Sequence, residues 1–184
     1  MFKKILALLM CLVFVFAVGC GKEEKKPVSN NESSQSEPEI VEPVFYKNPL
    51  TGIEDIEQQE VANRRPVAIM VNNLNIAQKV QCGLDKADIV YETEVEGGIT
   101  RLLAVYQDIT KSEKIGTVRS ARYAYVDLAM GHNAIYVHHG QDNTYCAPHL
   151  RDTDHFVLGT KNGGARLKNG LALEHTLYAY GSSL

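Results

Sequence analysis

The sequence predicts a single α/β or α+β domain built on a mixed β-sheet with a hairpin and flanking helices. Three observations support this prediction. Several short runs are rich in β-branched and aromatic residues, which favour strands. Two of these runs are joined by a short glycine-containing loop, which indicates an antiparallel hairpin. A later segment spaces apolar residues at helical intervals, so strands and helices interleave along the chain.

The strands come first. Residues 66–71 read as a buried apolar strand, with Pro66 at its entry, where a missing N–H is tolerated. Residues 88–95 and 99–107 form the predicted hairpin around Gly97 and Gly98. A short fourth strand is expected at residues 114–119.

Helices then alternate with further strands. Ser120 is predicted as the N-cap of a helix over residues 121–130, and Gly131 as the residue that closes it. The remaining expectations are a strand at 134–138, a short helix at 144–151 limited by Pro148, a weak strand at 156–158 and the beginning of an element at 177–184.

The N-terminus, residues 1–19, reads as a secretory signal peptide. Lys3 and Lys4 precede an apolar run at residues 5–18, which is shorter than the ~20 residues that a membrane-spanning helix needs. Small residues then lead to Cys20, which predicts cleavage before this cysteine and a diacylglycerol on its sulfur, although Ala17 replaces the commoner leucine. An ordinary cleaved signal or an uncleaved anchor explains the run but not Cys20.

Residues 20–44 read as a disordered, lipid-anchored tether, because they are rich in Glu, Lys, Ser, Asn and Pro and poor in apolar surface. A flexible segment of this length reaches about 25–30 Å on average. The folded domain is expected over residues 45–184 and is predicted to be truncated at its C-terminus. These features place the protein at the cell membrane, lipid-anchored through acyl chains such as palmitate, on the extracellular face.

Net charge argues against a nucleic-acid partner. The chain has 19 basic and 22 acidic residues, and loss of the signal peptide removes Lys3 and Lys4. The mature chain is therefore acidic, whereas nucleic-acid binding favours a basic face. The expected partners are the lipid bilayer, through Cys20, and a cell-wall polymer or envelope protein.

No motif predicts a metal, a cofactor or a catalytic nucleophile. Cys82 and Cys146 remain after export, and either two free thiols or a disulfide is consistent with the sequence, with free thiols favoured. His138 and His139 are adjacent on a predicted strand end, so they point to opposite faces and do not form a metal site easily. Phosphate-loop and nucleophile-elbow patterns are missing from the sequence.

The polar residues that could bind a ligand concentrate between residues 92 and 122. Alternating glutamates on one predicted strand should share a face. Three arginines near a helix start could hold an anionic group. A salt-bridge network between these glutamates and arginines is an equally plausible interpretation. The candidate ligand-binding residues are Glu92, Glu96, Arg101, Arg119, Arg122 and His138.

Several motifs occur in an order that resembles a known family. They are Asn48-Pro-Leu-Thr-Gly52, Arg65-Pro-Val-Ala-Ile-Met-Val-Asn-Asn73, Gly83-Leu-x-x-Ala-Asp-Ile-Val-Tyr-Glu92, Glu96-Gly-Gly-Ile-Thr-Arg101 and Ile115-Gly-x-Val-Arg-Ser-Ala-Arg122. The series resembles the YerB-like lipoproteins of Gram-positive bacteria, which carry domain of unknown function 3048. The resemblance implies a membrane-tethered envelope protein with no assigned reaction. It weakens after His138, where the family's Gly-Gly-Ser stretch is replaced.

Two hypotheses follow for the function. In the first, a non-enzymatic lipoprotein binds a cell-envelope ligand or partner protein through the region of Glu96, Arg101, Arg119 and Arg122. In the second, a cell-envelope hydrolase or transferase uses Glu92, Glu96 or His138 as an acid/base pair. An enzyme needs an accessible acid or base with a shifted pKa, whereas a binding protein needs accessible arginines.

Overall fold

The computed structural model describes residues 43–184. The predicted signal peptide, Cys20 and the tether up to residue 42 lie outside the described residues. Within residues 43–184, no helix combines the length and the apolar character that a bilayer span requires.

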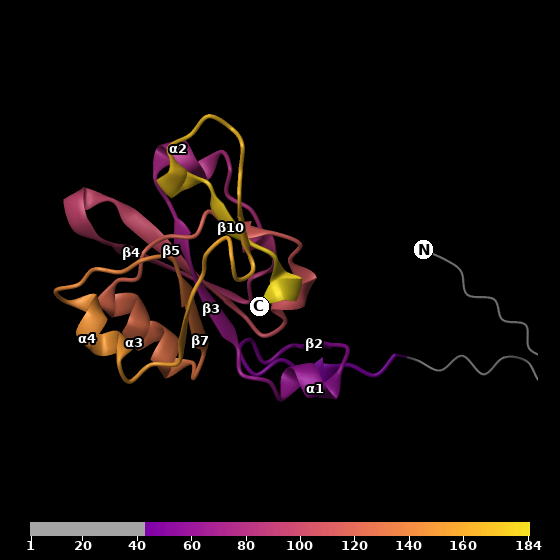
Figure 1. Ribbon diagram of the computed structural model, residues 1–184. Helices are drawn as coiled ribbons and strands as arrows, with labels where there is room; N and C mark the ends of the chain where they lie inside the picture. The colour runs from indigo at the N-terminus through magenta and orange to yellow at the C-terminus, as the bar shows by residue number, and fades with distance from the viewer. Residues whose placement is uncertain (1–42) are drawn as a thin grey trace, which may run out of the picture. The chain divides into compact units, whose positions relative to one another are not determined.

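A five-stranded mixed sheet forms the centre of the domain (Figure 1), in the order β4-β5-β3-β7-β8. Strand β3 runs antiparallel to β5 and parallel to β7, and β7 runs parallel to β8. The strand bounds are β3 Val67–Asn72, β4 Ile89–Glu94, β5 Thr100–Tyr106, β7 Ile135–His138 and β8 His155–Val157. This arrangement confirms the predicted mixed sheet with a hairpin.

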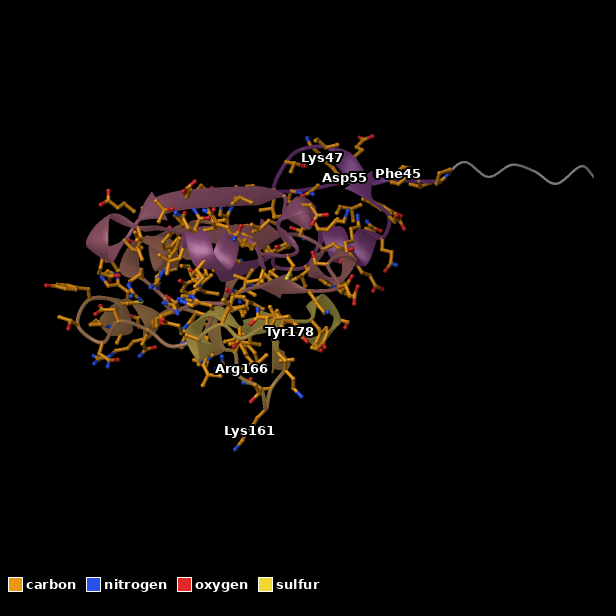
Figure 2. The ribbon with its side chains drawn as sticks, turned by 90° about the horizontal axis from the view of Figure 1, so that it is seen from above. Phe45, Lys47, Asp55, Lys161, Arg166 and Tyr178 are labelled. Carbon is orange, nitrogen blue, oxygen red and sulfur yellow. The ribbon has the colours of Figure 1, made fainter. Side chains whose placement is uncertain are left out.

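Two smaller sheets accompany the central one. A three-stranded sheet has the order β6-β10-β9, and a two-stranded sheet joins β1 to β2. Their strands are β1 Tyr46–Lys47, β2 Glu54–Ile56, β6 Ile115–Gly116, β9 Gly164–Arg166 and β10 Leu177–Ala179. Figure 2 shows Arg166 and Tyr178, from the three-stranded sheet, on the opposite side of the molecule from Phe45 and Asp55.

The helices are short. The α-helices are α1 Gln59–Ala62, α2 Asn75–Gln78, α3 Tyr123–Gly131 and α4 Cys146–Leu150. The 3-10 turns are η1 Leu84–Lys86, η2 Glu96–Gly98, η3 Ile109–Lys111, η4 Leu173–His175 and η5 Gly181–Ser183.

Both faces of the central sheet are covered. On one face, Met70, Leu103 and Val105 pack with Tyr125 and Ala129 of α3. On the other face, alternate strand residues pack with residues of the three-stranded sheet; this second group includes Ile69, Val71, Leu102, Ala104, Ile115, Leu177 and Ala179. The alternation follows from the two-residue period of a strand. It explains why β3 is apolar on both sides.

The predicted helix start at Ser120 is wrong. Helix α3 begins at Tyr123, and Arg122 occupies the N-cap position. The backbone N–H of Ala121 donates to the Gly140 carbonyl at 2.9 Å, which keeps residues before Tyr123 extended. Gly131 is the last residue of α3 rather than the residue beyond it.

Other expected elements are present with different bounds. The strand predicted at 114–119 is limited to β6, and the helix predicted at 144–151 to the five residues of α4, which include Pro148. Residues 177–179 form a strand, β10, which pairs with both β6 and β9.

One tyrosine ties α3 to the hairpin. The Tyr125 hydroxyl accepts a hydrogen bond from the Thr93 N–H at 2.9 Å and lies 2.5 Å from the Arg101 carbonyl, to which it can donate. Thr93 and Arg101 are directly opposed on β4 and β5. Tyr125 therefore fixes the position of the hairpin end relative to α3.

We expect Tyr125→Phe to lower the free energy of unfolding by about 1–2 kcal/mol, because it leaves the Thr93 N–H without its partner. Urea denaturation followed by circular dichroism measures the change. Tyr123→Phe is the matched control, since Tyr123 is 53% exposed on the same helix. Equal unfolding midpoints for the two variants would contradict the role assigned to Tyr125.

Candidate functional site

A surface pocket of about 430 Å³ lies where the hairpin end meets the start of α3. We call it the tyrosine pocket. Tyr123 and Tyr145 are 53% and 70% exposed, so both present aromatic surface to solvent. The lining residues are Thr93, Glu94, Val95, Glu96, Arg122, Tyr123, Ala124, Tyr125, Asp142 and Tyr145.

Local chain chemistry shapes the walls of this pocket. Gly97 and Gly98 have φ values of +73° and +70°, a region that glycine enters without a Cβ penalty, and they turn the chain back after Glu96. On the opposite wall, the Asp142 carboxylate accepts hydrogen bonds from the backbone N–H groups of Tyr145 and Cys146 at 2.6 and 2.9 Å. These bonds lower the pKa of Asp142 and hold Tyr145 in place.

Arg122 is held by two groups within the pocket region. Its Nε donates to Glu96 Oε1 at 2.5 Å, and its Nη1 donates to the Ala121 carbonyl at 2.8 Å. The hydrogen bond from Arg122 lowers the pKa of the Glu96 carboxyl. The Arg122 side chain is 19% exposed and that of Glu96 63%, so one partner of this ion pair is open to solvent. A partly exposed pair of this kind contributes little stability.

Arg101 does not line the tyrosine pocket, but it contacts the chain segment that leads to Arg122. It is 4% exposed on β5 and donates through Nη1 to the Ser120 carbonyl. Burial, together with the nearby positive charges of Arg122 and Arg119, lowers the pKa of Arg101 to about 10. Arg101 thus anchors the extended segment that precedes α3.

Arg119 belongs to a different cluster. Its Nη1 donates to the carbonyl and to the carboxylate Oε2 of Glu174, at 2.9 and 3.1 Å. Next to Glu174, His175 accepts a hydrogen bond on Nδ1 from the buried Asn72 amide at 2.9 Å. The expectation that three arginines converge on one anion pocket is therefore wrong. Arg122 lines the tyrosine pocket, whereas Arg101 and Arg119 are not among its lining residues. The successive residues from 119 to 122 are extended and so direct their side chains apart.

Glu92 and Glu96 do not share a face of one strand as predicted. Strand β4 ends at Glu94, and Glu96 lies in the 3-10 turn that follows. Glu92 instead accepts hydrogen bonds from Asn73 Nδ2 at 2.9 Å and from Thr100 Oγ1 at 2.6 Å, at a second groove. The turn made by the two glycines separates the two carboxylates.

His138 lies in the core and not at a pocket. It is fully buried, and its two ring nitrogens contact the Gly140 carbonyl at 2.7 Å and His155 Nδ1 at 2.9 Å. Since a carbonyl only accepts, His138 Nδ1 is the donor, and Nε2 accepts from His155 in the neutral ring. Burial lowers the pKa of His138 to about 4, with His155 and His139 acting in the same direction.

The remaining reactive groups among the described residues are the metal-ligand types and two cysteines. Among residues 43–184, no cluster of His, Cys, Asp and Glu is placed to hold a metal ion. Cys82 and Cys146 are both free thiols, which settles the alternative left open by the sequence. Burial raises the pKa of Cys146 to about 11, so this thiol is not activated as a nucleophile.

Comparisons with known proteins relate this domain to a protein family and to a solved structure. The mixed sheet and its surface pocket define an α+β domain in which no metal centre or activated thiol is formed by residues 43–184. Residues 50–184 match the model described as "Protein of unknown function (DUF3048) N-terminal domain". The chain therefore belongs to this family, as the motifs indicated.

One curated relative and one solved structure support the assignment. The chain is 41% identical over 131 residues to the Bacillus subtilis protein named "Putative lipoprotein YerB"; the alignment covers 71% of this chain and 34% of that protein. The crystal structure of YerB protein from Bacillus subtilis matches with a TM-score of 0.65 and 38% identity, over 75% of this chain and 47% of that chain. The chain thus spans about a third of the curated relative, whose name agrees with the lipoprotein prediction made from Cys20.

Sequence reasoning missed the residues that shape the pocket opposite the hairpin. Tyr123, Tyr145 and Asp142 were not singled out, although Asp142 followed two residues later by Thr144 is a typical side-chain cap of a turn. Asn73 was seen as part of a motif and not as a site residue. Nothing in the local pattern indicated that these residues meet the hairpin, because they come from separate segments outside its two strands.

The depressed pKa of His138 predicts acid lability. The folded state holds this imidazole neutral down to about pH 4, whereas the unfolded chain takes up a proton near pH 6.5. The free energy of unfolding should therefore fall as pH drops from about 6.5 toward 4, by up to about 3 kcal/mol. Urea titrations at several pH values measure this slope.

His138→Gln should be less stable at neutral pH but should lose much of the slope between pH 6.5 and 4, since glutamine does not titrate. His149→Gln, at an exposed position of α4, should keep the wild-type slope. An unchanged slope in His138→Gln would show that other groups cause the acid lability.

Proposed function

We propose that this chain is a membrane-anchored lipoprotein of the extracellular face that binds a cell-envelope polymer in the tyrosine pocket. The observation that carries the proposal is the combination, in one pocket, of two exposed tyrosines with Arg122 and Asp142. Pockets that bind polar ligands commonly pair aromatic surface with a few oriented hydrogen-bonding groups.

The charges of the pocket indicate the chemistry of the ligand. Arg122 is accompanied by the carboxylates of Glu94, Glu96 and Asp142, so the lining is net acidic. A purely anionic group is disfavoured there. Hydroxyl, amide or ammonium groups can donate to the carboxylates while a ring or chain face lies against the tyrosines. Wall polymers that expose such groups meet these requirements.

The predicted attachment suits this role. A diacylglycerol on Cys20 would hold the protein on the membrane, and a tether over residues 20–44 would carry the domain some 25–30 Å outward. The lipoprotein name of the Bacillus subtilis relative supports this membrane localisation.

Binding is favoured over catalysis by the state of the candidate acids and bases. The hydrogen bond from Arg122 lowers the pKa of Glu96, which makes this carboxyl a poor general acid near neutral pH. His138 is buried, and Glu92 lies in a different groove, so no acid/base pair is formed by these three residues.

We expect Cys20→Ser to release the protein from the membrane fraction into the medium or to leave it as an unprocessed precursor. Incorporation of labelled palmitate, followed by fractionation and immunoblotting, checks this outcome. Cys11→Ser is the control, because Cys11 lies in the predicted signal peptide. Equal palmitate labelling of Cys20→Ser and the original chain would refute lipidation at Cys20.

For the pocket, we expect Arg122→Ala and Tyr145→Ala each to weaken binding of enzymatically solubilised peptidoglycan fragments about tenfold, or about 1.4 kcal/mol. Isothermal titration calorimetry on the full chain in detergent micelles measures the affinity. Arg65→Ala is the matched control, since Arg65 is also paired with one carboxylate, Asp154, and does not line the pocket. If the pocket variants bind the fragments as tightly as the Arg65→Ala control, the proposal fails.

A further inference from the structure

A second groove lies on the other face of the same hairpin. Its volume is about 470 Å³, and its polar lining includes Asn73, Asn75, Gln78, Glu92 and Thr100. We call it the amide groove. It shares no lining residue with the tyrosine pocket. In Figure 1 the hairpin of β4 and β5 projects between α2, which borders the amide groove, and the pair α3 and α4.

The register of the hairpin explains the separation of the two concavities. Glu92 is directly opposite Leu102, and Thr100 is two residues before it, so both side chains lie on the face of Leu102. Leu102 packs toward the three-stranded sheet. Arg101 has the opposite parity and lies on the face covered by α3, where Tyr125 contacts its carbonyl.

A hydrogen-bond network fixes the floor of the amide groove. Asn73 Nδ2 donates to Glu92 Oε1 at 2.9 Å and to Thr100 Oγ1 at 2.8 Å. Thr100 Oγ1 donates to the same Glu92 oxygen at 2.6 Å, and Gln81 Nε2 donates to Asn73 Oδ1 at 3.1 Å. The network orients Asn73 and Glu92 before any ligand arrives, which reduces the ordering cost of binding.

Polar groups remain free at the rim. Among residues 43–184, Glu92 Oε2 and the side-chain amide of Asn75 make no hydrogen bond, and Glu92 has no ion-pair partner. The Gln78 side-chain Nε2 donates to Asn73, while its side-chain oxygen Oε1 makes no hydrogen bond within the described residues. The groove therefore presents both donors and acceptors in a small area.

The apolar part of the lining complements these groups. Ile76 is 51% exposed, and Leu74 and Ile99 are half-buried beside it. Glu92 is the single charged residue of the lining, so an anion would meet repulsion with no compensating cation. A neutral ligand with many hydroxyl and amide groups satisfies the free donors and acceptors and places its C–H surface on the isoleucines.

We propose that the amide groove is a saccharide-binding site for neutral, N-acylated sugar units, separate from the tyrosine pocket. Sugar hydroxyls both donate and accept, so one hydroxyl can donate to Glu92 Oε2 while accepting from the Asn75 amide, and another can donate to the side-chain oxygen of Gln78. An acyl amide on the sugar offers one more donor and acceptor to the same side chains. Since the amide groove and the tyrosine pocket share no lining residue, an experiment can refute the proposal for one site while the proposal for the other stands.

The test is calorimetric titration of the full chain in detergent micelles with the neutral tetramer of N-acetylglucosamine. Asn75→Ala combined with Gln78→Ala should weaken binding at least fivefold, and Glu92→Gln at least threefold. Asn75 and Gln78 are exposed on α2, and thermal unfolding of the double variant establishes that it is folded. Gln59→Ala, at an exposed position of α1, is the matched control and should bind as the original chain does.

Three results would overturn the proposal. The first is no measurable heat of binding with the tetramer at millimolar concentration. The second is tetramer binding that Tyr145→Ala abolishes and the amide-groove variants leave unchanged, which would place the sugar in the tyrosine pocket and support that site alone. The third is binding of the polyamine spermidine, and not of the tetramer, with the same dependence on Glu92, which would make the groove a cation site.

Discussion

Strand β3 has no side open to water, and this constraint organises the rest of the domain. Its residues from Ala68 to Val71 are fully buried on alternating faces, so each face of the sheet needs its own cover. Helices α3 and α4 bury one set of side chains, and the three-stranded sheet buries the other. The pairing partners follow from the same requirement, because a central strand buried on both faces must also satisfy its backbone groups on both edges.

The hairpin of β4 and β5 extends to the border of this cover, and the candidate sites lie at that border. The hydroxyl of Tyr125 holds one face of the hairpin end against α3, while the network of Asn73, Glu92 and Thr100 fixes the other. Beyond these contacts Gly97 and Gly98 of the turn are exposed. Two surface concavities therefore flank one hairpin that is anchored on both faces but incompletely covered.

The arginines illustrate how tertiary structure distributes charge. Arg101 is buried and donates through Nη1 to the backbone carbonyl of Ser120, Arg119 pairs with Glu174, and Arg122 pairs with Glu96 at the pocket. Burying a guanidinium without partners is unfavourable, so each arginine is matched locally. Salt bridges thus account for two of the three, and the pocket that remains is net acidic rather than cationic. The ordered motifs, in contrast, identified the family correctly.

The sequence by itself determined the mixed sheet, the hairpin, the family and the features that predict a lipoprotein. These depend on local signals: β-branched runs, the Gly97-Gly98 turn and the apolar segment before Cys20. Only the tertiary structure decided that α3 starts at Tyr123, that Glu92 and Glu96 belong to different concavities, and that His138 is a core residue. Each of these depends on a contact between distant segments, such as Ala121 with Gly140 or Asn73 with Glu92, and a pattern of neighbouring residues carries no information about such partners.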